Sequence, residues 1–91
     1  MGNAAGLKAL QVLANAEHVL AIELLAGAQA VEFLAPLEPG LGVRATRAFV
    51  RTLSSRLDDD RSLSADIERV TESVRDGRVV AAVEAAVGAL A

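Results

Sequence analysis

The feature that most constrains this fold is a long stretch, from about Asn3 to Ala35, that contains no proline and consists mostly of strong helix formers. It predicts one helix of roughly 30 residues, about 45–50 Å long. The chain is 53% hydrophobic, and because only two residues are aromatic, this content is almost entirely Ala, Val and Leu. Such side chains are typical of closely packed helices. With 91 residues, the chain suits one small domain, and a second is not expected.

One face of this predicted helix is polar towards both ends and apolar in the middle. Polar residues recur along one face at Lys8, Gln11, Asn15, His18, Gln29 and Glu32. Ile22 and Leu25 occupy the centre of that face, so the helix is apolar nearly all round there. A chain this short has too few other residues to enclose it, so we expect another chain to cover it. The predicted interface contains Leu20, Ala21, Ile22, Leu24, Leu25, Gly27 and Ala28. Gly27 lies within the helix, and a second backbone packed against it is favoured over neutral drift as the explanation.

The rest of the chain predicts a loop and shorter helices. Residues 36–42 include two prolines and two glycines and predict a loop. Apolar periodicity predicts a second helix over about 43–57 and a third from Ser64, which stops at Asp76-Gly77 before a helical tail. No strand or internal repeat is predicted. The sequence thus indicates an all-α fold that is part of a helical bundle: a long core and oligomerisation helix (1–35), a Pro/Gly loop (36–42) and two or three shorter helices (43–91).

Charge and residue types exclude several classes of function. The net charge is −3, and the basic residues from Arg44 onward are interspersed with acidic ones, which argues against nucleic-acid binding. The absence of cysteine and the presence of a single histidine argue against a zinc site. The first apolar stretch is interrupted by Glu17, His18 and Glu23, which argues against a signal peptide or a membrane span. We therefore expect a soluble, cytoplasmic protein with no membrane partner.

Few side chains are placed for catalysis. His18 follows Glu17, but adjacent helical residues point about 100° apart, so a surface or interface histidine is favoured over an acid–base pair. Glu17 and Glu23 lie off the polar stripe. If buried, they need arginines from the second helix or from another chain, and a structural ion pair is favoured over a site role.

The other polar clusters also predict no site. The run Asp58–Asp60 lacks the frame of a calcium loop and predicts a solvated helix end. Ser54, Ser55, Ser62 and Ser64 have no neighbouring His or Lys to activate them and are interpreted as cap and turn residues. No catalytic, cofactor-binding or metal-binding residue is predicted.

Several segments carry a family resemblance. The most distinctive is Glu17-His18-Val19-Leu20-Ala21-Ile22-Glu23-Leu24-Leu25-Ala26, within the longer run from Gly6 to Ala30. The similarity continues through the segments 36–42, 60–67 and 79–84. Together they resemble the C-terminal helical segment of histidine ammonia-lyases, which are aromatic amino acid lyases. The resemblance covers nearly the whole chain.

The resemblance implies a cytoplasmic, homotetrameric enzyme of histidine catabolism that eliminates ammonia from L-histidine to give urocanate. Its electrophile is a methylidene-imidazolone that forms from an internal Ala-Ser-Gly, and this chain contains no Ala-Ser-Gly. The family also carries Gln-Glu-Asp-His just upstream of the Met-Gly that matches Met1-Gly2. None of the family's catalytic positions has a match in these residues. The isolated chain is therefore predicted to be inactive, and the remainder of a lyase chain is its expected partner.

Two functions of different classes stay open on the sequence. In the first, the chain is the C-terminal part of a lyase and contributes to its core and its oligomer packing. In the second, it is a stand-alone helical oligomerisation module without catalysis. An in-frame Gln-Glu-Asp-His in the DNA upstream would favour the first, whereas a stop codon and a ribosome-binding signal there would favour the second.

Overall fold

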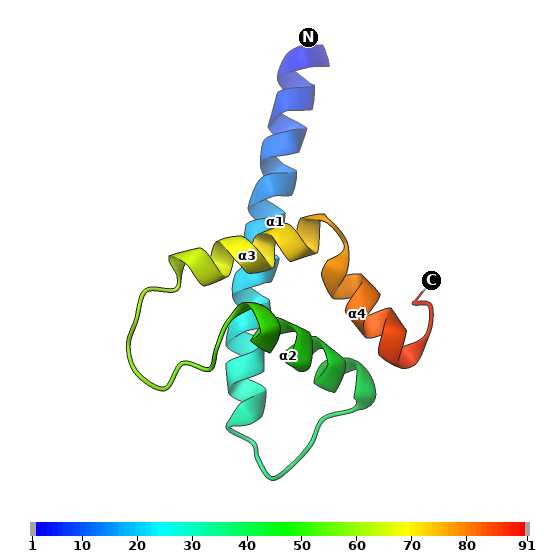
Figure 1. The fold of residues 1–91 in the computed structure, drawn as a ribbon. Coiled ribbons are helices and arrows are strands. Elements are labelled where there is room, and N and C mark those ends of the chain that lie inside the picture. Colours follow the sequence, from blue (N-terminus) through cyan, green and yellow to red (C-terminus); the bar gives the residue numbers. More distant parts are fainter. Residues whose placement is uncertain (1, 91) are drawn as a thin grey trace.

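Residues 2–90, the part of the chain that the computed structural model describes, form four helices and no strand (Figure 1). The helices are α1 (Gly2–Glu32), α2 (Leu41–Leu53), α3 (Ser64–Arg75) and α4 (Arg78–Val87). The predicted all-α fold, with a long first helix followed by shorter ones, is confirmed. Met1 and Ala91, which end two of the predicted segments, lie outside the described residues.

Helix α1 extends well beyond the body of the molecule. α2 and α3 cross its carboxyl-terminal half, and its amino-terminal half runs clear of the other helices (Figure 1). α4 packs on α2 and α3. Leu7 and Leu10 in the projecting half therefore stay 69% and 64% exposed. By length and composition alone α1 could cross a membrane, a criterion that core helices of soluble proteins also meet.

The core is small and lies where α2 and α3 cross α1. Val50 of α2 and Val70 of α3 are fully buried, together with Ser73. Ala21 and Ala28 are the buried residues of α1, and their spacing of two helical turns places them on one face. Small side chains at these positions allow neighbouring helices to approach closely. The amphipathic α2 and α3 are thus anchored on one side of α1.

Helix α1 ends at Glu32, slightly earlier than the predicted Ala35, and the chain turns over residues 33–36. Pro36 explains the earlier end, because a proline disfavours the helical conformation at the residue before it. It also has no backbone N–H to continue the hydrogen-bond ladder. The effect of Pro36 thus extends into the preceding residues, and α1 ends before the predicted boundary.

Helix α2 ends at Leu53, whereas the sequence predicted about residue 57. The physical reason is a competing set of tertiary hydrogen bonds. The side-chain amide of Gln29 donates to the carbonyl of Leu57 at 3.1 Å and accepts from the N–H of Leu57 at 3.3 Å. The backbone at Ser54 is already extended. Leu57 is consequently held against α1 as part of a loop.

Candidate interaction site

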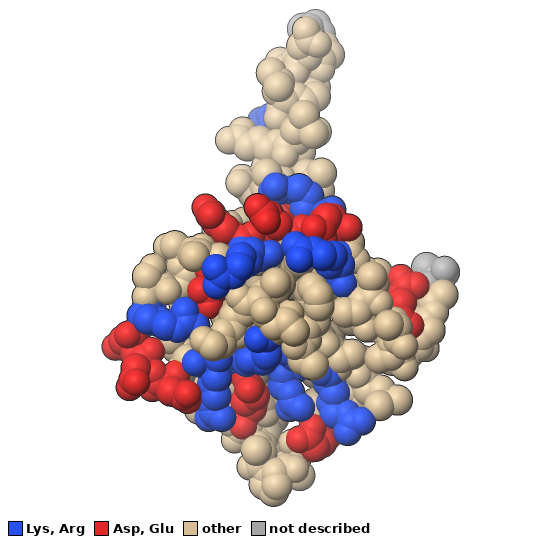
Figure 2. Space-filling view, in the orientation of Figure 1, with Lys and Arg blue, Asp and Glu red and all other residues tan. Residues whose placement is uncertain are grey.

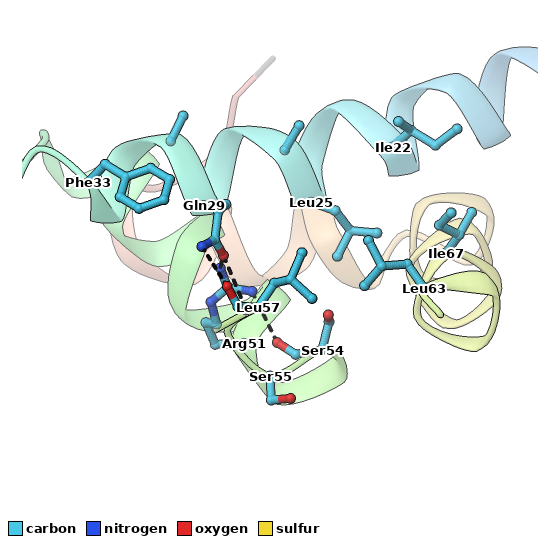
Figure 3. A pocket seen from close by; sticks show the side chains of 12 residues that line it. Ile22, Leu25, Gln29, Phe33, Arg51, Ser54, Ser55, Leu57, Leu63 and Ile67 are labelled. Atoms are coloured by element: carbon cyan, nitrogen blue, oxygen red, sulfur yellow. Dashed lines mark hydrogen bonds between the residues drawn. The ribbon is translucent and has the colours of Figure 1, made fainter. Parts of the chain in front are cut away.

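An apolar groove of about 380 Å³ lies between α1 and the segment that joins α2 to α3 (Figure 3). One wall comes from the α1 side and includes Ile22, Leu25 and Phe33, and the opposite wall includes Leu57 and Leu63. The groove is open, since Ile22 is 43% exposed and Phe33 is 70% exposed. Residues 2–90 thus leave a broad apolar surface uncovered beside their own core.

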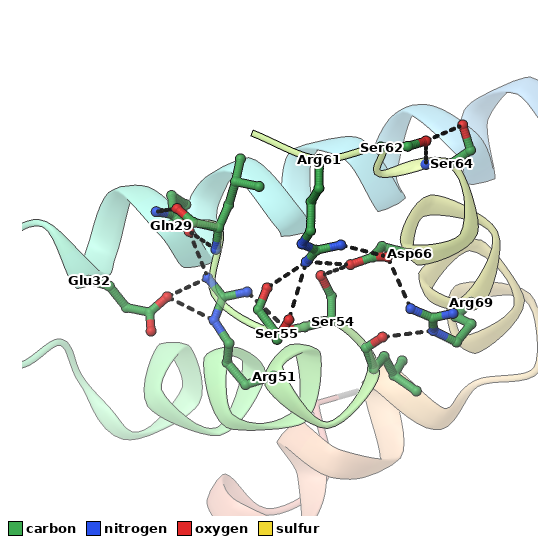
Figure 4. Close-up of polar contacts among 12 residues, drawn as sticks. Gln29, Glu32, Arg51, Ser54, Ser55, Arg61, Ser62, Ser64, Asp66 and Arg69 are labelled. Carbon is green, nitrogen blue, oxygen red and sulfur yellow. Dashed lines mark hydrogen bonds and ion pairs between the residues drawn. The ribbon is translucent and has the colours of Figure 1, made fainter. Parts of the chain in front are cut away.

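A first polar network ties α2 to α1 at one end of this groove (Figure 4). The Arg51 guanidinium donates to Glu32 Oε1 at 2.8 Å, to Gln29 Oε1 at 3.2 Å and to the carbonyl of Ser54 at 3.2 Å. The hydrogen bond from Arg51 is the main reason that the pKa of Glu32 lies below its ordinary value. Gln29 and Glu32, two members of the polar stripe, therefore point towards α2 and hold the fold together.

A second polar network surrounds Asp66 in the first turn of α3 (Figure 4). This carboxylate is only 3% exposed. It accepts hydrogen bonds from Arg61 at 3.0 and 3.2 Å, from Arg69 at 3.0 Å and from the Ser54 hydroxyl. Arg69 also donates to the carbonyl of Leu53 at 2.8 Å. The network therefore fastens the end of α2, the connecting loop and the start of α3 to one buried charge.

These contacts lower the pKa of Asp66 from 3.8 to about 2, mainly through the hydrogen bonds from Arg61 and then that from Ser54. A carboxylate whose pKa is lower in the folded state stabilises the fold above its unfolded pKa, and this stability is lost as the pH falls towards the folded value.

We expect the urea concentration at the midpoint of unfolding to drop between about pH 5 and pH 2, with Asp66 contributing about 1–2 kcal/mol. An Asp66→Asn variant, compared with the parent in the same titration, should lack this part of the acid dependence. Parallel curves for the two proteins would contradict the assignment.

The structure divides the predicted interface residues into three groups. Ala21 and Ala28 are buried within this chain, Leu24 and Leu25 are half-buried, and Leu20, Ile22 and Gly27 are exposed. No atom of the described residues outside the local helix would come within 4 Å of a Cβ added at Gly27. The close backbone neighbour expected at this glycine is therefore not part of residues 2–90. The interface itself stays a prediction.

The acidic residues singled out in the sequence are only partly brought into contacts. Glu17 pairs with Arg75 of α3 at 3.2 Å. The expected ion pair is thus present. The predicted source of its arginine, α2 or another chain, was wrong, because sequence spacing does not reveal which helix crosses α1 at Glu17. Glu23, His18 and Asp58–Asp60 are exposed. Within residues 2–90, no three His, Asp or Glu side chains are grouped as they would be around a metal ion.

Sequence reasoning missed the residues that organise the site: Arg51, Arg61 and Asp66. The available signal was the pairing of Asp66 with Arg69 three residues later, a spacing that brings helical side chains together. Burial of Asp66 was not readable from that spacing. Arg51 is half-buried against α1, which the sequence pattern of its own helix does not indicate.

Comparison with known proteins identifies the family to which these helices belong. The family model described as "Aromatic amino acid lyase" matches residues 1–54. The chain belongs to the aromatic amino acid lyase family. This lyase segment is 49% identical to the histidine ammonia-lyase of Symbiobacterium thermophilum over 90 residues, which is 99% of the segment and 18% of that protein. The histidine ammonia-lyases of Gloeobacter violaceus and Myxococcus xanthus are 44% and 45% identical over 99% and 94% of it.

The lyase segment thus spans about 18% of the length of these relatives. No solved structure matches it. The described residues of this segment have an exposed helix, an open apolar groove and two polar networks that hold the helices together.

Proposed function

We propose that this chain is the C-terminal helical segment of a histidine ammonia-lyase, in which it contributes to the core and the oligomer packing and is inactive alone. One observation carries the proposal: α1 buries one face of its carboxyl-terminal half and leaves its other apolar side chains exposed. Such a surface is suited to being covered by other helices. The identity to proteins named histidine ammonia-lyase supports the choice of enzyme.

In this proposal the remainder of the lyase supplies the chemistry, which is the elimination of ammonia from L-histidine to give urocanate in histidine catabolism. The methylidene-imidazolone would form from an Ala-Ser-Gly outside these residues. The partners of the segment are that remainder and the other subunits of a cytoplasmic homotetramer. Within the segment, the Arg51 network ties α2 to α1, and the Asp66 network ties the end of α2 and the connecting loop to α3.

Complementation tests this function. The 91-residue chain is co-expressed with the Symbiobacterium thermophilum lyase truncated by the matching segment. Urocanate formation from L-histidine, followed by its absorbance, should appear only when both pieces are present. A chain carrying Leu7→Glu and Leu10→Glu should fail to complement, since each unpaired charge in an apolar contact costs several kcal/mol. The matched pair Asp58→Ala and Asp59→Ala, in the exposed loop, should complement fully.

Two outcomes would contradict the proposal. One is urocanate formation by the truncated lyase without the chain, and the other is no turnover although both pieces are soluble and helical. The second outcome, together with stable self-association of the chain, would favour the stand-alone oligomerisation module.

A further inference from the structure

A second pocket, of about 190 Å³, lies between α1 and α2 and shares no lining residue with the apolar groove. Gly27 of α1 lines it, and Leu24, Val31 and Val43 supply apolar walls. A Cβ added at Gly27 would meet no atom of the described residues outside the local helix within 4 Å, so the pocket is open above this residue. Its volume is below the roughly 300–1,000 Å³ of drug-sized sites and suits a molecule the size of an amino acid.

Opposite charges line this pocket from the two helices. Glu23 comes from α1 and Arg47 from α2. On the face shown in Figure 2, most basic side chains lie beside acidic ones. Glu23, by contrast, is exposed, and none of the ion pairs within residues 2–90 includes it. Arg47 donates to Glu38 through Nη2 at 3.2 Å, which leaves other guanidinium donors for a second acceptor. The pocket therefore presents an anion and a cation beside apolar walls.

The glycine and the unpaired carboxylate lie one helical turn apart and point to one occupant. Glycine is less favourable than alanine within a helix, and nothing in residues 2–90 packs closely against Gly27. A helix laid over Gly27 would also cover Glu23, and a carboxylate removed from water needs a cation beside it. A small ligand that carries its own cation meets both requirements.

We propose that this pocket binds a zwitterionic α-amino acid with a small aliphatic side chain. Its ammonium group lies beside Glu23, and its carboxylate accepts hydrogen bonds from Arg47. Its side chain rests above Gly27, between Val31 and Val43. Such charge-assisted hydrogen bonds are stronger than those between neutral groups, so a zwitterion is preferred to a ligand with one charge. The site goes beyond the proposed function, because the elimination of ammonia does not use it.

Amide chemical shifts of the isotope-labelled chain, titrated with L-leucine, test the site. We expect saturable shifts at Gly27 and Val43, with a dissociation constant of about 1 mM, as for a small ligand in an open pocket. Leu63, in the apolar groove, should not shift. N-acetyl-L-leucine lacks the ammonium group and L-leucinamide lacks the carboxylate, so each should bind at least about tenfold more weakly. Equal binding of the three molecules, or no saturable shift at Gly27, would overturn the inference.

Two substitutions test which charge recognises which group. Glu23→Gln should weaken L-leucine binding about tenfold and leave N-acetyl-L-leucine unchanged, because that molecule has no ammonium group to lose a partner. Arg47→Gln should weaken L-leucine binding likewise and leave L-leucinamide unchanged. Glu68→Gln and Arg44→Gln, at exposed sites outside the pocket, are the matched controls and should bind L-leucine as the parent does. A uniform loss for all three molecules would contradict the assigned contacts.

Gly27→Leu tests the pocket without removing a charge. The added side chain has open space, and leucine favours a helix more than glycine does, so the chain should keep its helical content. Its side chain should fill the pocket and weaken L-leucine binding at least about tenfold. Gly6→Leu makes the same change in the projecting half of α1, also in open space, and should bind like the parent. Unchanged binding by Gly27→Leu would overturn the inference.

Complementation separates this inference from the proposed function. L-Leucine that is present while the purified chain and the truncated lyase assemble, and is removed before the assay, should leave urocanate formation unchanged. Less urocanate would show that the lyase and the ligand compete for the pocket, which would overturn the inference. Complementation without L-leucine binding would overturn the site and leave the lyase function standing. L-Leucine binding without complementation would do the opposite.

Discussion

Replacing Asp66 with alanine is expected to lower the free energy of unfolding by about 2–3 kcal/mol, which is a large part of the stability of so small a core. The variant removes the acceptor of Ser54, whose side chain is buried, and leaves that hydroxyl without its partner. It also releases Arg61 and Arg69 from the carboxylate that holds them. The link between the end of α2 and the start of α3 should therefore open first.

Urea unfolding followed by circular dichroism measures this loss. Asp58→Ala removes a carboxylate that is 74% exposed and is the matched control, with an expected change below about 0.5 kcal/mol. Asp66→Asn keeps the size and one acceptor oxygen and should fall between the two. Equal midpoints for Asp66→Ala and Asp58→Ala would show that the network contributes nothing measurable.

Replacing Arg51 with methionine is expected to cost about 2 kcal/mol, since Glu32 would lose its cation and Gln29 would lose a donor. Both side chains of the Arg51–Glu32 pair are only 19% exposed, so water replaces the guanidinium incompletely. Methionine retains most of the apolar stem, and the loss therefore reports on the charge and its hydrogen bonds. The pKa of Glu32 should rise towards its ordinary value.

Hydrogen exchange and a pH titration separate this effect from general loosening. Amides of α2 should exchange faster in Arg51→Met, while amides of α3 that depend on Asp66 should keep more of their protection. Arg44→Met, at an exposed arginine of the same helix, is the control and should match the parent protein. Equal loss of protection in α2 and α3 would mean that Arg51 does not act locally.

The helices could be predicted from sequence because their determinants are local. The proline-free stretch with Ala and Leu predicts α1, and the prolines and glycines of 36–42 predict its end to within a few residues. Apolar periodicity over about 43–57 and from Ser64 predicts α2 and α3. These signals need no knowledge of the neighbouring helices.

The site could not be predicted as well, because it depends on contacts between residues far apart in the chain. Gln29 and Glu32 belong to the same polar stripe as the exposed Lys8, and only the crossing of α2 shows that they face inward. Likewise, a helix that is apolar nearly all round does not reveal which of its faces the other helices of the chain cover. Ala21 and Val19 are alike in a sequence pattern, yet one is fully buried and the other is exposed.

The paired hydrogen bonds between Gln29 and Leu57 have a consequence for how α1 is oriented. A side-chain amide that both donates to and accepts from one residue's main chain reproduces the hydrogen bonding of a single rung in a β-ladder. The rung fixes the rotation of α1 about its own axis through backbone atoms, which any residue except proline supplies at position 57. The side chain at position 57 can therefore change without changing the rotation of α1 about its axis.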